Sequence, residues 1–307
     1  MKSAQQLLSK WEKSTLDDFK AFIAEFDEWV EANLKAHNDD HLIGQIYKEN
    51  LFFWTENEYT QVCKCQAELA HRCLKSICKD IERKSDIYPS RTKHIVDLIF
   101  DLAPFMDQIM RKKDPNYQFI AGGKSYSQNS IWMFREASNL FWSSTVADKN
   151  LLSHMSAIAL SVFALRQAVE IRFRRAIGIL KIVDEANQND AKLRHDFILD
   201  FVAKNLDLIE LKIGSMINLT RIYKWTNFSI HTGGMPRIWE IQFALEYCGK
   251  VFEPDAPDPK KGWDINSSVK IKNYAELKKR WENEVKTAFQ NRKWHFLYLE
   301  KPEAVFN

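Results

Sequence analysis

The sequence predicts an all-α protein, a bundle of long helices, and three observations support this fold class. The chain has only nine glycines and eight prolines in 307 residues, so turns are scarce. A β-sandwich or barrel needs a turn every ten residues or so, and a doubly wound nucleotide fold needs glycine-rich turns after its strands. Helical periodicity of apolar residues runs through most of the chain. The hydrophobic fraction of 45% is ordinary for a globular protein and is enough for a full core.

The N-terminal part is expected to be helical up to a first loop at 113–126. Four helical segments are predicted before that loop: 3–36, 41–53, 57–84 and 91–112. Thr15, followed by two aspartates, is typical of a helix N-terminus. A polar break is expected at 37–40, and a stop at Tyr88-Pro89-Ser90. Pro104 should kink its helix because it lacks the N–H of a helical hydrogen bond.

The C-terminal part is expected to continue as longer helices. They are predicted over 128–142, 150–185, 191–231, 237–248 and 273–291, with a short apolar tail. A polar turn at 185–190 has the length that joins antiparallel neighbours. Gly233-Gly234 should end the helix 191–231, and a proline-containing loop is expected at 253–268. This divides the chain into an N-terminal helical region, 1–126, and a C-terminal bundle with an extension, 127–307. The scarcity of flexible linkers favours one core shared by both.

Charge and cysteine content point to a cytoplasmic protein without a membrane partner. The net charge of +3 is too small to indicate nucleic-acid binding by itself, so a polyanion site needs a local cluster. The N-terminus has no apolar signal segment, and the uncharged stretch at 150–165 is too short and polar to span a bilayer. Five cysteines, an odd number in a large chain, are typical of a reducing compartment.

A first polar constellation lies in the predicted helix 150–185. Arg166, Glu170 and Arg174 follow one another at four-residue spacing and therefore share one helix face. Arg172 and Arg175 add positive charge among apolar neighbours. A polar stripe in so apolar a helix must pair, reach water or bind an anion. An internal Arg–Glu–Arg ladder and a phosphate site are both compatible with this pattern.

A second polar constellation ends the predicted helix 191–231. Tyr223, Asn227 and His231 share one face, with Lys224 beside them and Arg221 one turn earlier. His231 precedes two glycines, so it lies at a helix C-terminus, where the dipole favours its protonated form. Such an imidazole is suited to general acid–base catalysis or to a structural capping role.

The two constellations together resemble the HEPN superfamily of all-α proteins. The resemblance covers about residues 150–235 and depends on an Arg-x3-Glu helix followed by one that closes in Asn227-Phe228-Ser229-Ile230-His231. It implies a dimeric bundle and metal-independent RNA cleavage, in a bacterial toxin–antitoxin or antiphage defence setting. Thr226 occupies the family's arginine position. A cation from Lys224, Arg221, Arg166 or Arg174 would then have to stabilise the phosphate charge.

Several weaker patterns favour structural roles. Cys63, Cys65, Cys73 and Cys78, with His71 among them, lack the paired CxxC spacing of zinc sites and are better explained as small apolar residues. Gly122-Gly123-Lys124-Ser125 lacks the first glycine of a phosphate-binding loop. Four tryptophans are expected to serve as core or interface anchors rather than as a base-stacking platform: Trp239, Trp263, Trp281 and Trp294.

Two readings of function follow, with a hydrolase as a distant third. In the first, an RNA-directed protein uses His231 as acid or base and Asn227 as its orienting partner. Phosphate is then held by the residues of both constellations: Lys224, Arg221, Arg166, Arg174, Glu170 and Tyr223. In the second, a homodimerising or protein-binding module has no activity and buries His231. The hydrolase would group Glu68, His71, Asp97 and Asp101 by helical spacing. None of these readings requires a metal or other cofactor.

Overall fold

The protein is mostly helical, which confirms the predicted class at its coarse level. The computed structural model describes residues 1–10, 13–47, 55–83, 88–122, 129–143, 151–186, 190–191, 193–194, 196–234, 236–257, 262, 264–290 and 292–306. Eleven helices and five short strands are formed within these residues. The chain divides into two compact units, Met1–Tyr126 and Ser127–Asn307. Each unit has its own cluster of buried apolar side chains.

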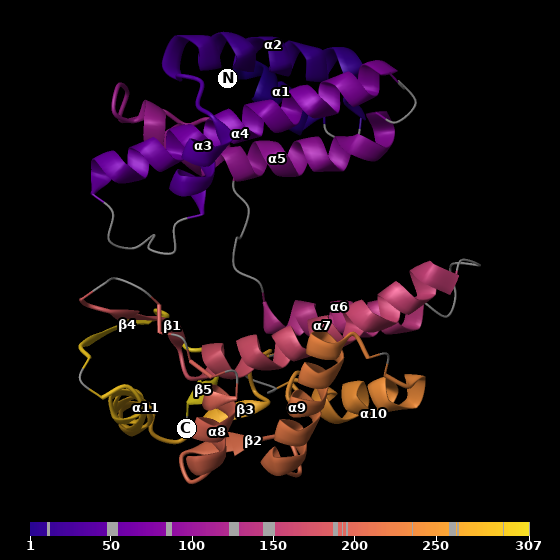
Figure 1. Cartoon of the computed structure of the whole chain (residues 1–307), viewed down its shortest axis with the longest axis vertical. Coiled ribbons are helices and arrows are strands. Elements are labelled where there is room, and N and C mark those ends of the chain that lie inside the picture. Colours follow the sequence, from indigo (N-terminus) through magenta and orange to yellow (C-terminus); the bar gives the residue numbers. More distant parts are fainter. Residues whose placement is uncertain are drawn as a thin grey trace. The chain divides into compact units, whose positions relative to one another are not determined.

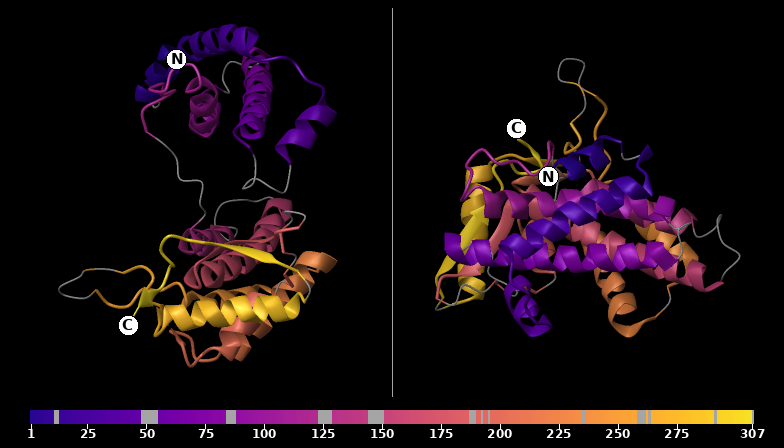
Figure 2. Two further views of the ribbon diagram at one scale, coloured as in Figure 1. Left: turned by 90° about the vertical axis from the view of Figure 1, so that its left-hand side faces the viewer. Right: turned by 90° about the horizontal axis from the view of Figure 1, so that it is seen from above.

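The first unit is a helical bundle. Its helices are α1 (Lys2–Ser9), α2 (Leu16–Asn33), α3 (Asp39–Ile46), α4 (Glu56–Arg83) and α5 (Tyr88–Met110). In Figure 1, α4 and α5 run side by side, and the right view of Figure 2 shows α2 crossing them obliquely. Phe22, Phe26 and Leu74 are among the side chains fully buried between these helices. These side chains come from the apolar faces of amphipathic helices.

Helix boundaries in the first unit follow local signals. The predicted N-cap at Thr15 is confirmed, because its side chain accepts a hydrogen bond from the Asp18 N–H while Asp18 accepts one from the Thr15 N–H. The predicted stop at 88–90 is wrong, since α5 begins at Tyr88. Pro89 lies in the first turn of α5, where a missing N–H costs nothing. Pro104 lies inside the same helix.

The second unit combines helices with two small sheets. Its elements are α6 (Ser130–Ser143), α7 (Leu151–Ala176), β1 (Ile179–Asp184), α8 (Phe197–Lys204), β2 (Ile209–Leu211), α9 (Met216–Thr232), α10 (Ile238–Gly249), β3 (Val269–Ile271), α11 (Tyr274–Ala288), β4 (Trp294–Tyr298) and β5 (Val305–Phe306). β1 pairs antiparallel with β4, and β3 pairs antiparallel with β2 and parallel with β5. In Figure 1, α6 and α7 run side by side, and α9 lies against α7.

The predicted helix 150–185 is wrong at its C-terminal end, because α7 stops at Ala176 and the chain turns into β1. Gly178 has a φ of +82°, and a Cβ there would lie 2.6 Å from the Tyr274 hydroxyl and 2.9 Å from Pro302. Only glycine fits at position 178, where the backbone is left-handed and packs against Tyr274 and Pro302. The β-branched residues Ile179, Ile182 and Val183 then pack into the core as a strand.

The predicted helix 191–231 is also wrong, because it contains α8, β2 and α9 as separate elements. The break is stabilised by the pairing of Ile209 with Ile271, a residue far along the chain. The apolar tail likewise supplies β4 and β5. Pairing between strands that are distant in the sequence leaves no local sequence pattern. At these short segments, tertiary contacts outweigh the helix propensity of the residues. The helices carrying the two polar constellations are therefore not connected by a single turn.

Arg172 ties α7 to the C-terminal segments of the unit. Its side chain is fully buried. The guanidinium donates to the Val251 carbonyl at 2.9 Å, the Glu303 carbonyl at 2.8 Å, the Asn266 carbonyl at 3.1 Å and the Ser268 hydroxyl at 2.9 Å. Burial lowers its pKa to about 10. The guanidinium therefore stays charged at neutral pH, and its donors have partners.

Candidate functional site

A cleft of about 350 Å³ opens between α7 and α9 and brings parts of both constellations together. Arg166, Glu170 and Arg174 line it from α7, and His231 lines it from the last turn of α9. The remaining lining residues are mostly apolar: Phe163, Gln167, Ile171 and Ile230. His231 is exposed, and Gly233 ends the helix in the left-handed conformation with a φ of +68°, as predicted. The cleft thus presents an imidazole beside two guanidinium groups.

Tyr223 links the two helices beneath the cleft. Its hydroxyl donates to Glu170 Oε2 at 3.1 Å, and the Arg166 guanidinium lies 5.1 Å from the centre of its ring. Burial and, next, the Glu170 charge raise the pKa of Tyr223. The phenol therefore stays a neutral hydrogen-bond donor, which keeps the Glu170 carboxylate facing it. The ring also attracts Arg166 through a cation–π contact.

The stripe on α7 does not form the closed ladder that its spacing allows. Within the described part of the chain, neither Arg166 nor Arg174 makes an ion pair with a carboxylate, and Glu170 accepts from Tyr223 instead. Arg174 donates to the Leu180 carbonyl at 2.8 Å. Arg166 Nη1 is buried without a hydrogen-bond acceptor among the described residues. The two arginines therefore contact a tyrosine ring and a backbone carbonyl, and no carboxylate among the described residues neutralises their charge by an ion pair.

A smaller hollow of about 190 Å³ adjoins the cleft and shares Glu170 and Arg174 with it. Lys181 of β1 and Arg194 before α8 line this hollow. Lys181 pairs with Asp190 at 2.8 Å, and Arg194 pairs with Asp196 and Asp200. Sequence patterns do not indicate either residue at the site, because they predict continuous helices over both. They meet the cleft only after α7 ends and β1 turns back.

Other predicted site residues lie elsewhere on α9. Lys224 Nζ is 3.4 Å from Asp196 Oδ2, and Arg221 is exposed with Nη1 3.4 Å from Asn218 Oδ1. Neither side chain lines the cleft, and the lining also leaves out Asn227, whose amide Oδ1 is buried without a donor among the described residues. The structure thus brings His231 together with Arg166, Glu170 and Arg174, and with Tyr223 beneath them.

Thr226, at the position where the resemblance would place arginine, faces the core. Its side chain is 1% exposed, and its hydroxyl donates to the Tyr223 carbonyl at 2.6 Å. A guanidinium at this position would point away from the cleft. The cations near His231 come from α7 instead.

The weaker patterns have mixed outcomes. Cys63 and Cys65 are buried and Cys73 is exposed, and none of the three is in a disulfide with another described residue. Burial raises the pKa of Cys63 to about 11. Lys124 and Ser125, like Trp263, lie outside the described residues. Trp281 and Trp294 are buried as anchors, whereas Trp239 is 66% exposed.

The residues of the hydrolase reading face different partners. Glu68 bonds to His37 and Arg72, whereas His71 pairs with Asp27. Glu68 and His71 therefore belong to two different ion-pair networks and do not form one shared site. Asp97 and Asp101 lie on α5.

Neither a family model nor a curated protein nor a solved structure matches this chain. Among the described residues, no helix combines the length and the apolar character needed to cross a membrane. Function therefore has to be inferred from the residues of the cleft.

Proposed function

We propose that this protein acts on RNA through the α7–α9 cleft, as a HEPN-like endoribonuclease or as a relative that binds RNA without cutting it. The observation that carries the proposal is the convergence of His231 with Arg166 and Arg174 on one cleft. An imidazole can act as the acid–base group of metal-independent phosphodiester cleavage, and guanidinium groups can stabilise the phosphate charge that develops. A bacterial toxin–antitoxin or antiphage setting and a homodimer belong to the same proposal.

The geometry suggests a division of labour. Arg166 and Arg174 would hold the non-bridging phosphate oxygens, since both line the cleft and guanidinium groups suit phosphate. Glu170, held by Tyr223, would place a carboxylate in the cleft between the two arginines. The exposed imidazole of His231 would meet the RNA from the opposite side of the cleft.

In the cleaving form, His231 removes the proton from the ribose 2′-hydroxyl. The 2′-oxygen then attacks phosphorus, the bond to the 5′-oxygen breaks, and that oxygen takes up a proton from water. The products are a 2′,3′-cyclic phosphate and a free 5′-hydroxyl. The arginines stabilise the charge that develops on phosphorus oxygens. Asn227, one turn before His231, would orient the imidazole in this proposal, and this role requires its amide to turn out of its buried position.

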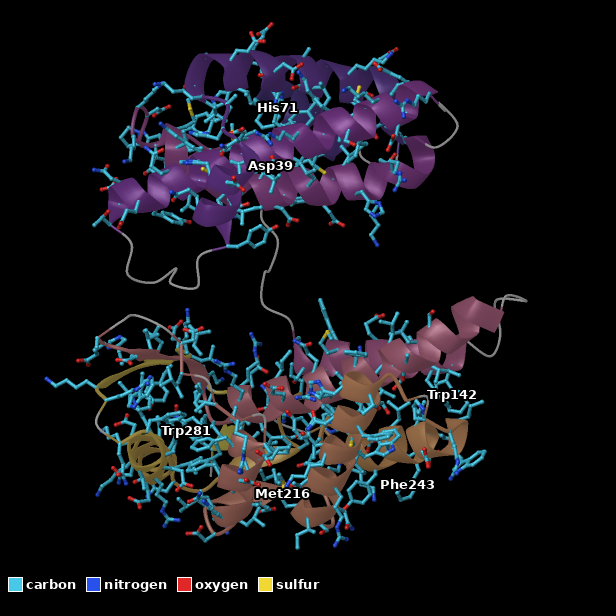
Figure 3. All side chains as sticks on the ribbon, in the orientation of Figure 1. Asp39, His71, Trp142, Met216, Phe243 and Trp281 are labelled. Carbon is cyan, nitrogen blue, oxygen red and sulfur yellow. The ribbon has the colours of Figure 1, made fainter. Side chains whose placement is uncertain are left out.

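The second candidate is a non-enzymatic interaction module, and exposed aromatic residues favour it. Phe228 on α9 is 63% exposed, and Trp239 and Phe243 on α10 are 66% and 64% exposed. Trp142 and Phe243 are labelled in Figure 3, where they project from α6 and α10. Large aromatic side chains of this kind are typical of protein interfaces.

The experiment compares RNA cleavage by the full-length protein and by His231→Ala, in EDTA, on total RNA and tRNA. Wild-type cleavage should fall about 100-fold or more in the variant, because an acid–base group of this kind contributes at least that much. His94→Ala removes another exposed histidine, on α5, and should leave cleavage unchanged.

Binding to RNA separates the remaining outcomes. Salt-dependent binding without cleavage would identify the binding-only relative. Neither binding nor cleavage by the wild type would reject RNA as the partner and leave the interaction module.

A further inference from the structure

Two histidines and a cysteine meet in the first unit, whereas the cleft belongs to the second unit. One possible ligand atom each from His37, His41 and Cys65 lies within 4.8 Å of the others. His37 precedes α3, His41 lies in its first turn, and Cys65 is a buried residue of α4. Nitrogen and thiolate sulfur are the donors that zinc and other borderline-soft transition metals prefer.

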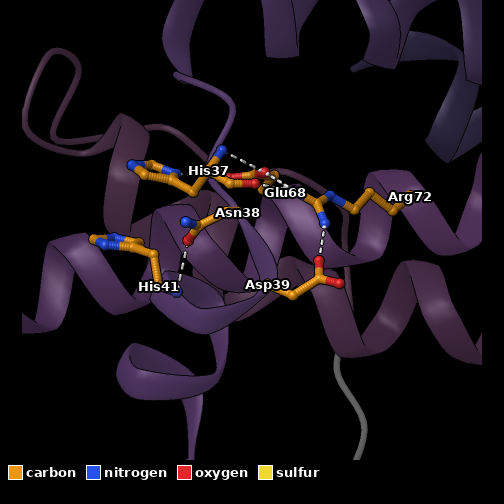
Figure 4. A network of polar contacts seen from close by, with 6 residues as sticks. All are labelled: His37, Asn38, Asp39, His41, Glu68 and Arg72. Atoms are coloured by element: carbon orange, nitrogen blue, oxygen red, sulfur yellow. Dashed lines mark hydrogen bonds and ion pairs between the residues drawn. The ribbon is translucent and has the colours of Figure 1, made fainter.

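Local structure holds the two histidines on one side. The Asn38 side chain caps α3 by accepting the His41 N–H at 2.9 Å. This cap sets the chain direction between the histidines, and their rings stack with centres 4.2 Å apart. Figure 4 shows both imidazoles on the same side of the cap. His41 is exposed, so an ion has a path from solvent.

A buried carboxylate supports His37 from behind. Glu68 is 5% exposed, and its oxygens accept the His37 N–H at 2.9 Å and contact His37 Nδ1 at 2.8 Å. Arg72 Nη2 lies 2.7 Å from the same carboxylate, and its Nη1 is 2.8 Å from Asp39. The carboxylate directs the Nδ1 proton toward itself, which leaves Nε2 of His37 as an electron-pair donor. Metal-binding histidines typically have this support.

We propose that His37 Nε2, an imidazole nitrogen of His41 and Cys65 Sγ form a Zn²⁺ site. The Cys65 thiol gives its proton to solvent as the sulfur binds the ion. Magnesium and calcium are poor candidates, because they prefer oxygen ligands. The ion would fix the α3 segment to α4 and would act independently of the cleft in the second unit.

Titration of the chelator-treated full-length protein with Co²⁺ and Zn²⁺ tests the site. We expect one ion per chain and a sulfur-to-cobalt charge-transfer band. Cys65→Ser should abolish that band and weaken Zn²⁺ binding by about 100-fold or more, since a ligand matters at least as much as its support. Cys73→Ser, an exposed cysteine of the same helix, is the matched control and should change neither.

Glu68→Gln sharpens the test because it keeps all three ligands. It should weaken Zn²⁺ binding about 10- to 100-fold while the cobalt band remains. Circular dichroism of each variant without metal checks that the helices persist. The proposal is overturned if folded wild type binds no stoichiometric ion, or if Cys65→Ser binds Zn²⁺ as tightly as Cys73→Ser does.

Discussion

Helices α4 and α7 each carry glutamate and arginine at four-residue spacing, yet the two stripes end in opposite states. In α4, Glu68 and Arg72 form an ion pair that His37 and Asp39 complete. In α7, Glu170 bonds to Tyr223. The arginines on either side of it make no ion pair within the described residues. The charged groups of the α4 stripe are paired with neighbouring residues, whereas those of the α7 stripe line a cleft.

The difference shows that spacing alone does not decide whether a charged stripe is structural or available to a ligand. Spacing places side chains on one face, but the element packed against that face supplies or withholds partners. His37 brings its backbone N–H and its ring Nδ1 to Glu68, and Asp39 pairs with Arg72. The facing part of α9 brings a phenol and an exposed imidazole. We therefore expect changes in the α4 stripe to affect stability and changes in the α7 stripe to affect binding.

The largest effect is expected within α7 itself, at Arg172. Arg172→Leu removes a guanidinium that is fully buried and leaves several carbonyls without donors. The free energy of unfolding should fall by about 3 to 5 kcal/mol, as for other broken buried charge networks. Urea unfolding followed by tryptophan fluorescence measures this. A loss no larger than that of Arg174→Leu would contradict the structural role assigned to Arg172.

The second largest effect is expected at Glu68, whose contribution to the free energy of unfolding should depend on pH. Burial would raise the pKa of Glu68, but the hydrogen bonds from His37 and Arg72 outweigh burial and hold its pKa below the ordinary value of 4.5. The stabilisation is therefore complete above the pKa of the unfolded chain and is lost as pH falls through the lower pKa of the folded protein. Glu68→Gln in chelator should cost about 2 kcal/mol at neutral pH, typical of charged hydrogen bonds.

Hydrogen exchange across 37–46, measured at neutral and acidic pH, locates this effect. Wild type should lose protection on acidification, and the variant should lose less because its side chain does not titrate. Equal acid sensitivity in both proteins would show that Glu68 does not control the attachment of α3.

The smallest effect on stability, and the one that separates the two helices, is expected at Arg174. Arg174→Gln should change the free energy of unfolding by less than about 0.5 kcal/mol, as for most surface substitutions. If Arg174 contacts phosphate, the slope of log affinity for RNA against log salt should decrease in magnitude by about one. Arg135→Gln, an exposed arginine of α6, serves as the control. An unchanged slope would remove Arg174 from the RNA-binding surface.

Much of the helical structure was predictable because its signals are local. The Thr15 cap, the length of α4 and the Gly233 stop follow from neighbouring residues in the sequence. The missed strands have a different origin. β1 needs β4 as a partner, and β2 needs β3, so their stability comes from residues far along the chain. Lys181 and Arg194 were missed at the site for the same reason.

Local sequence patterns are enough to predict that this chain is mostly helical. They also place Arg166, Glu170 and Arg174 on one helix face, because an α-helix repeats about every 3.6 residues. Tertiary packing determines which charged residues are buried or paired and which face the cleft. It buried Arg172 and Thr226, paired Lys224 with Asp196, and left His231 beside the α7 arginines. It also joined His37 and His41 to Cys65 across two helices. Hydrogen-bond partners and burial are properties of packing, and packing joins residues that local patterns do not connect.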